Sequence, residues 1–193
     1  YLGFPFSISE TFQQRNTNSS IIDSFENVKA IQDLCTKNDK ELVLYISMGF
    51  GNPYGDPWDK DIAGEWVEKL HKQGIKIFSL SDTVGQANTK DISYIFKELI
   101  PHFSNCEFGA HLHTTKENWS QNIAAAYNSG CRRFDAALRG FGGCPMAEDD
   151  LVGNLATENL IHFLQQEEEK LNLDMEAFNQ AINMAPDIFE SIS

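Results

Sequence analysis

Short β-rich segments alternate with longer segments of helical periodicity along this chain of 193 residues. The strand candidates begin about every 25–35 residues, which is the size of one βα unit. They are Leu2–Ser7, Leu42–Ser47, Ile75–Leu80, Phe108–His113 and Arg133–Leu138, the first being the weakest. Parallel strands need long crossover connections, which helices supply. The alternation therefore predicts a parallel α/β fold, either an open doubly wound sheet or a (β/α)8 barrel.

The segments between the strand candidates carry apolar residues at helical spacing. In the first of them, Ser19 and Ser20 before Asp23 resemble a capping box. We expect helices near Ile21, at Asp56-Pro57, at Thr89, near Trp119, after Gly153-Asn154 and at Asp174. Gly74 is expected to end the second helix and Pro101 the third, since neither residue continues a helix well.

Two observations favour a barrel over an open sheet. No GxGxxG turn follows a strand candidate, as a dinucleotide-binding sheet would favour. Polar residues also follow the strand candidates, at the end where barrels carry their active sites. They are Ser47, Asp82-Thr83, His111 with His113, and Arg139 ahead of Gly142-Gly143-Cys144.

A complete barrel takes about 250 residues and eight strands. With fewer strand candidates, the chain is expected to cover only about strands 4–8 of a TIM barrel, plus C-terminal helices. We interpret residues 1–193 as a single domain, the C-terminal portion of such a barrel, with residues 165–193 as a helical extension.

Composition excludes several classes of partner. The formal net charge of -13 argues against nucleic acid and against an anionic membrane surface. No apolar run approaches the roughly 20 residues that a membrane-spanning helix needs. The four cysteines lack the spacing of a metal knuckle or of a small disulfide framework, which favours a reduced, intracellular setting.

The segment His111-Leu112-His113 ends a strand candidate. Residues two apart in a strand point to the same side, so both imidazoles can face one divalent metal ion. The alternative is a pair of ordinary polar residues at a strand end. Asp82 has a comparable alternative as a loop cap, and Asn154 as a helix cap.

Gly142-Gly143-Cys144-Pro145 places a thiol in a glycine-rich loop ahead of Gly153-Asn154. Glycines let a backbone come close to a ligand and change shape around it. A lone cysteine is more often a small buried apolar residue. A hydrophobic core has no need of this glycine-rich sequence, so the loop is interpreted as functional.

Four segments together resemble the hydroxymethylglutaryl-CoA lyase family of metal-dependent barrel lyases. They are Ser81-Asp82-Thr83-Val84-Gly85, Ala110-His111-Leu112-His113, the cysteine loop from Phe141 to Ala147, and Gly153-Asn154-Leu155-Ala156-Thr157-Glu158. The likeness covers roughly Tyr1 to Leu164. The cysteine loop with its Gly-Asn-Leu-Ala-Thr-Glu continuation is specific, whereas His-x-His is shared with related synthases and aldolases.

The resemblance implies a retro-aldol cleavage of 3-hydroxy-3-methylglutaryl-CoA to acetoacetate and acetyl-CoA. It assigns His111, His113 and Asn154 as ligands of Mg2+ or Mn2+. Cys144 would protonate the carbanion or take part in a proton relay, and His111 is also a candidate base. Asp82 and Glu158 would be supporting or proton-handling groups. An acyl-CoA substrate, a homodimer at full length and a cytoplasmic location (the mitochondrial matrix in a eukaryote) are further implications.

The sequence also departs from the family pattern. Thr114-Thr115 follows His-x-His where the family usually has Asp, and Glu148-Asp149-Asp150 replaces small residues. The family's first-strand Asp-Arg pair has no counterpart, so this chain alone is expected to be incomplete as an enzyme. The alternatives are a related metal-dependent aldolase, a 2-isopropylmalate-synthase-like enzyme, or an inactive fragment.

Overall fold

A computed structural model describes residues 1–143 and 152–189 of the chain. Cys144 and the acidic segment 148–150 therefore lie outside the described residues. The strands are β1 (Leu2–Ser7), β2 (Leu42–Ser47), β3 (Ile77–Asp82), β4 (Glu107–Leu112) and β5 (Arg133–Asp135). The helices are α1 (Glu10–Thr17), α2 (Ile21–Lys37), α3 (Lys60–Lys72), α4 (Thr89–His102), α5 (Trp119–Tyr127), α6 (Thr157–Gln166) and α7 (Met175–Phe189), with a 3-10 turn, η1, at Leu138–Gly140.

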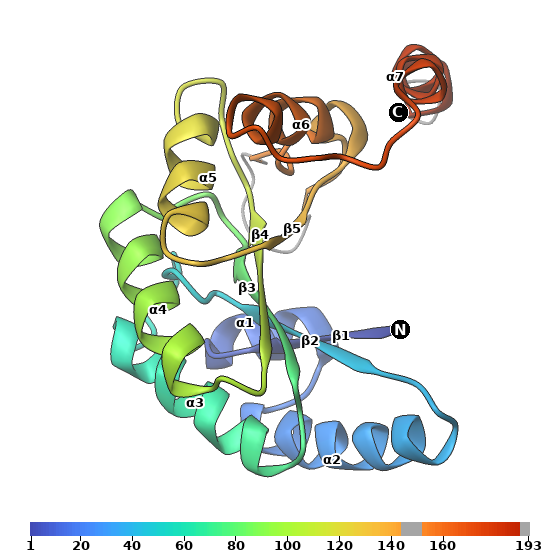
Figure 1. The fold of residues 1–193 in the computed structure, drawn as a ribbon. Helices are drawn as coiled ribbons and strands as arrows, with labels where there is room; N and C mark the ends of the chain where they lie inside the picture. Colours follow the sequence, from blue (N-terminus) through green and yellow to red (C-terminus); the bar gives the residue numbers. More distant parts are fainter. Residues whose placement is uncertain (144–151, 190–193) are drawn as a thin grey trace.

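The five strands form one parallel sheet in the order β1-β2-β3-β4-β5. A doubly wound sheet would reverse its strand order at a switch point, whereas a barrel adds each strand beside the last. Figure 1 shows α2 to α6 in an arc along one side of this sheet. The topology confirms the predicted α/β architecture of part of a (β/α)8 barrel.

Several predicted boundaries shift in the structure. The second helix begins at Lys60 rather than at Asp56-Pro57, because Asp59 is its N-cap and accepts the backbone N–H groups of Asp61 and Ile62 at 2.9 and 2.8 Å. Pro101 does not stop the third helix, since α4 continues to His102.

Asp56 instead joins two loops. Its carboxylate accepts the backbone N–H of Thr11 at 2.9 Å and the Ser9 hydroxyl at 2.5 Å, at the start of α1. The sequence pattern missed α1 because this helix is short and polar. Its Ser9 N-cap and the left-handed Asn18 at its end account for its limits.

Two strand predictions also need correction. Strand β3 runs to Asp82 and begins at Ile77 rather than Ile75, whose N–H still bonds to the helix that precedes it. Strand β5 ends at Asp135 rather than at Leu138 because the chain turns there into η1. Arg139 in that turn has a left-handed φ of 55°.

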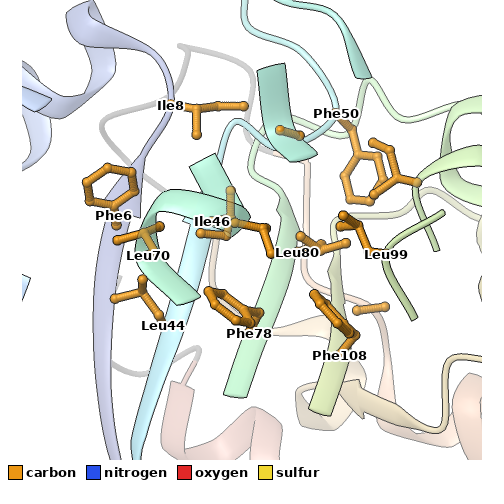
Figure 2. Close-up of a cluster of buried hydrophobic side chains, with 14 of the residues drawn as sticks. Phe6, Ile8, Leu44, Ile46, Phe50, Leu70, Phe78, Leu80, Leu99 and Phe108 are labelled. Carbon is orange, nitrogen blue, oxygen red and sulfur yellow. The ribbon is translucent and has the colours of Figure 1, made fainter. Parts of the chain in front are cut away.

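One face of the sheet packs against the helices and forms the main core. Phe78 and Phe108 occupy paired positions on β3 and β4, and their rings stack with centroids 5.5 Å apart. Figure 2 shows these rings beside Leu44 and Leu80, with Leu70 and Leu99 of the covering helices. The alternation of apolar residues along each strand therefore places the core on the side of the arc of helices.

Three cysteines lie in the described part of the chain as free thiols: Cys35, Cys106 and Cys131. Burial raises the pKa of Cys131 to about 12, so this thiol stays protonated. No helix among residues 1–143 and 152–189 has both the length and the apolar character needed to span a bilayer.

Candidate active site

The carboxyl ends of the strands surround a cleft of about 430 Å³. Its walls come from β1 to β4, from α1 and from the segment ahead of α6. The lining residues are Pro5, Phe12, Asn16, Tyr45, Ser47, Ser81, Thr83, His111, His113, Gly143 and Asn154. The cleft lies at the end of the sheet where the sequence predicts the site.

His111 and His113 lie on the same side of the chain at the end of β4. Their ring centroids are 5.6 Å apart, and both line the cleft. His113 is buried, whereas the side chain of His111 is 30% exposed. The alternation of a strand thus brings the two imidazoles together, as the His-x-His spacing predicts.

Asn154 lies beside this pair through backbone pairing. It forms an antiparallel bridge with His113, flanked by the bonds from Thr114 N to Gly153 O at 3.0 Å and from Leu155 N to Leu112 O at 2.9 Å. Residues more than 40 positions apart in sequence, such as His111 and Asn154, therefore share one wall of the cleft.

The pKa of His113 is lowered to about 4. Burial is the main cause, and the charge of His111 adds to it, while a hydrogen bond with the backbone of Val152 acts in the opposite direction. His113 is therefore a neutral imidazole at physiological pH. The neutral ring is the form that binds a metal ion.

The donor set suits a hard to borderline divalent cation. The Asn154 amide nitrogen donates to Phe141 O at 2.9 Å, so the amide oxygen is the atom left for a ligand. Among residues 1–143 and 152–189, no three His, Cys, Asp or Glu side chains are grouped as a cation site. The described donors are accordingly the two imidazoles and one amide oxygen.

Asp82 lies apart from the cleft. It pairs in register with Leu112, whereas Ser81 pairs with His111, so Asp82 is on the opposite face of the sheet from the histidines. Its carboxylate accepts the N–H groups of Gln86 and Ala87 at 2.9 and 3.1 Å. Burial raises its pKa to about 6, although the backbone bonds act to lower it.

Glu158 lies in the first turn of α6 and lines a neighbouring cleft that shares Asn154 with the first. Its Oε2 accepts the N–H of Arg139 at 3.0 Å and so holds the turn that leads to the glycine loop. Thr114 and Thr115 also line this second cleft rather than the histidine cleft.

The cysteine loop begins at the histidine cleft. Gly143 lines the cleft, and Gly142 before it has a φ of 88° that disfavours other residues. A Cβ atom on Gly142 would lie 3.0 Å from Asn154 Nδ2. The glycine therefore lets the loop pass close to Asn154, although Cys144 itself lies outside the described residues.

Three polar residues near His111 were not singled out from the sequence. Asp135 Oδ2 lies 3.5 Å from His111 Nδ1, Arg133 Nη2 lies 3.4 Å from Asp135 Oδ1, and Tyr45 has its ring 5.6 Å from that of His111. The available signal was the alternation in Arg133-Phe134-Asp135, which places both charged residues on one face of β5.

The HMGL-like family model matches residues 3–185. The chain is 33% identical over 174 residues to hydroxymethylglutaryl-CoA lyase YngG of Bacillus subtilis, covering 88% of this chain and 56% of that protein. It is 31% identical over 175 residues to the 3-hydroxy-3-isohexenylglutaryl-CoA/hydroxymethylglutaryl-CoA lyase of Pseudomonas aeruginosa, covering 90% and 57%.

A solved structure also matches closely. It is that of an HMG-CoA lyase from Acinetobacter baumannii in complex with coenzyme A and 3-methylmalate, with a TM-score of 0.88 and 28% identity. The match covers 98% of this chain and 61% of that one. The chain spans little more than half the length of the curated relatives named here.

Proposed function

Because the chain belongs to the HMGL-like family, we propose that the protein is a carbon–carbon lyase that cleaves 3-hydroxy-3-methylglutaryl-CoA to acetoacetate and acetyl-CoA. The observation that carries the proposal is the convergence of His111, His113, Asn154 and the start of the glycine loop on one cleft. The likeness to hydroxymethylglutaryl-CoA lyases over most of this chain supports the same reaction.

In this proposal His111, His113 and Asn154 hold Mg2+ or Mn2+. When bound, the cation supplies Lewis acidity toward the hydroxyl and carbonyl oxygens of the substrate. The neutral His113 keeps a lone pair for this role at physiological pH. The buried position of His113 fixes its ring, so little rotamer freedom is lost on binding.

The reaction needs a base and an acid. Loss of the proton from the tertiary hydroxyl makes that oxygen a carbonyl and breaks the adjacent C–C bond, whose electron pair stays on the acetyl-CoA fragment. We propose Cys144 as the group that protonates this carbanion, because its loop starts at the cleft. Asp82 and Glu158 support the site by holding the loops after β3 and β5.

His111 has two candidate roles, cation ligand and base for the hydroxyl proton. One ring nitrogen cannot do both at once, since each role uses the same lone pair. If His111 is a ligand, His111→Ala weakens Mn2+ binding in calorimetry. If it is only a base, the Mn2+ affinity of the variant equals that of the wild type.

We further propose that activity requires additional βα units, because the chain covers 61% of the structurally similar lyase. The full-length enzyme is proposed to be a homodimer that acts in the cytoplasm or, in a eukaryote, in the mitochondrial matrix. A lyase assay on the full-length protein with Mg2+ or Mn2+, detecting acetoacetate and acetyl-CoA, tests the activity. The absence of both products would overturn the proposal.

A related substrate is the second candidate, because the Pseudomonas aeruginosa relative is named for a 3-hydroxy-3-isohexenylglutaryl-CoA activity as well. Comparing kcat/KM for the methyl and isohexenyl substrates separates the two. A higher value for the isohexenyl substrate would assign the protein to the longer side chain while leaving the retro-aldol chemistry in place.

A further inference from the structure

A second group of polar side chains lies deeper on the face of the sheet that carries the histidines. Register pairs Tyr45 with Ser79, Ser79 with Gly109 and Gly109 with Arg133 in one row across β2 to β5. The next row toward the cleft pairs His111 with Asp135. Paired residues of a parallel sheet share a face, so these side chains lie together.

Asp135 is the centre of this group. Its Oδ2 accepts the Ser79 hydroxyl at 2.7 Å, and its Oδ1 lies 3.4 Å from Arg133 Nη2. Burial acts to raise the pKa of Asp135, but the Ser79 hydroxyl, the nearby His111 ring and the charge of Arg133 outweigh it and hold the pKa below its usual value. The carboxylate is therefore held from two sides, by the Ser79 hydroxyl and by the Arg133 guanidinium.

Gly109 leaves room for the side chain of Arg133, which lies beside Asp135. A Cβ atom at this position would lie 2.8 Å from Arg133 Nη1 and 3.1 Å from its Cγ. Arg133 therefore lies directly over the backbone of β4, in a gap that only glycine leaves open. Gly109 therefore allows Arg133 to pack within this polar group, because any larger residue would collide with it.

His111 borders the group on the cleft side. Its Nδ1 lies 3.5 Å from Asp135 Oδ2 and is buried with no closer hydrogen-bond partner in the described part of the chain. The Tyr45 ring packs at nearly a right angle to the imidazole, with 5.6 Å between ring centroids. With Nδ1 directed toward Asp135, Nε2 is the ring atom left to act in the cleft.

We propose that Asp135 is a positioning residue that holds the proton of His111 on Nδ1 and so presents the Nε2 lone pair to the cleft. The inference deepens the proposed function and rests on it for the role of His111. A carboxylate that receives the second N–H of an imidazole fixes both the tautomer and the ring orientation, and it makes the other nitrogen a better donor to a cation.

Nitrogen-15 NMR of the histidine side chains in the metal-free full-length protein tests the tautomer directly. We expect wild-type His111 to carry its proton on Nδ1, and Asp135→Leu to shift the ring toward the Nε2–H form. Asp135→Asn keeps an acceptor oxygen at the same place and should retain the wild-type tautomer. Asp33→Leu, which makes the same change on the exposed face of α2, serves as the control.

Calorimetric titration with Mn2+ gives a second readout. Asp135→Leu should weaken Mn2+ binding by about 10–100-fold, as removal of such a partner usually does. Asp135→Asn should lose less than Asp135→Leu, and Asp33→Leu should lose nothing. A purely structural role for Asp135 would lower thermal stability equally in the Leu and Asn variants without altering the tautomer.

The inference is overturned if wild-type His111 carries its proton on Nε2, or if a folded Asp135→Leu variant keeps the wild-type tautomer. The wild-type spectrum alone decides the question if Asp135→Leu does not fold. Neither readout needs substrate, so a failure here is distinct from a failure of the lyase assay. If the protein cleaves the substrate although His111 does not carry its proton on Nδ1, the proposed function stands and only the positioning role of Asp135 is wrong.

Discussion

The two faces of the same strands differ sharply in chemistry. On the helix-covered face, Phe78 and Phe108 stack in an apolar core. On the opposite face, Ser79, His111 and Asp135 form a hydrogen-bonded and charged group beside the cleft. Because side chains alternate along a strand, one residue's shift in register would exchange these faces. Stability and chemistry therefore depend on separate sets of residues held by one backbone.

The largest expected effect comes from a truncation on the apolar face. Phe78 is fully buried, so Phe78→Ala should lower the free energy of unfolding by about 3–5 kcal/mol through lost burial and a residual cavity. Urea denaturation measures this loss. A loss below about 1 kcal/mol would show that this face is not the main source of stability.

Truncation of His113 on the polar face should lower activity much more than stability. If His113 is a cation ligand, as we propose, His113→Ala in the full-length protein should reduce kcat/KM by at least about 100-fold, since loss of even an outer partner of a metal ligand costs about 10–100-fold. The free energy of unfolding should fall by no more than about 1–2 kcal/mol. His102→Ala, an exposed histidine in the last turn of α4, should leave kcat/KM unchanged.

Asp82 tests the helix-covered face at the carboxyl end of β3. Its folded pKa of about 6 lies above its ordinary value of 3.8, so the folded state binds this proton more tightly than the unfolded chain does. The contribution of Asp82 to the free energy of unfolding is therefore fully present below about pH 4, and it is lost as the pH rises through about 6. Asp82→Asn removes this dependence.

The relative stability of Asp82→Asn should therefore increase by up to about 3 kcal/mol between pH 4 and pH 7. Denaturant unfolding of both proteins across this range measures the difference. A difference between variant and wild type that does not change with pH would contradict the assignment of a buried, titrating carboxyl group.

The smallest expected effect concerns Gly109 of β4, which leaves room for Arg133 on the polar face. Gly109→Ala forces Arg133 away from its position over the strand, at a cost of about 1–3 kcal/mol for overpacking. Thermal denaturation measures this cost. Gly64→Ala in α3, where an added Cβ atom would have its nearest neighbour at 3.8 Å, is the control and should be neutral or stabilising.

Much of the fold could be predicted from the sequence because its signals are local. The alternation of strand and helix patterns predicted all five strands and the helices from α2 onward, and Ser20 does cap α2 as its capping-box sequence predicts. The predicted start of α3 was wrong because Asp56 and Asp59 are both acceptable N-cap residues. Only the position of the loop against Ser9 and Thr11 decides between them.

The candidate site was predictable to a smaller extent. The spacing of His111 and His113 places both rings on one side by local geometry alone. Asp82 does end its strand as predicted, but only its pairing with Leu112 showed that it lies on the other face from the histidines. The contacts of Asp135 with Ser79 and His111 join three strands, and no local pattern encodes such a meeting.

The sequence by itself determined the succession of βα units, the face of each strand that is apolar, and the His-x-His spacing that places two imidazoles on one side of the chain. These follow from the period of side chains along a strand or helix and from the glycine-rich loop. The tertiary structure alone decided that Asn154 pairs with His113 and that the Arg133 side chain packs against Gly109 of the neighbouring strand. Such contacts depend on strand register and on the packing of distant segments, which only the folded chain brings together.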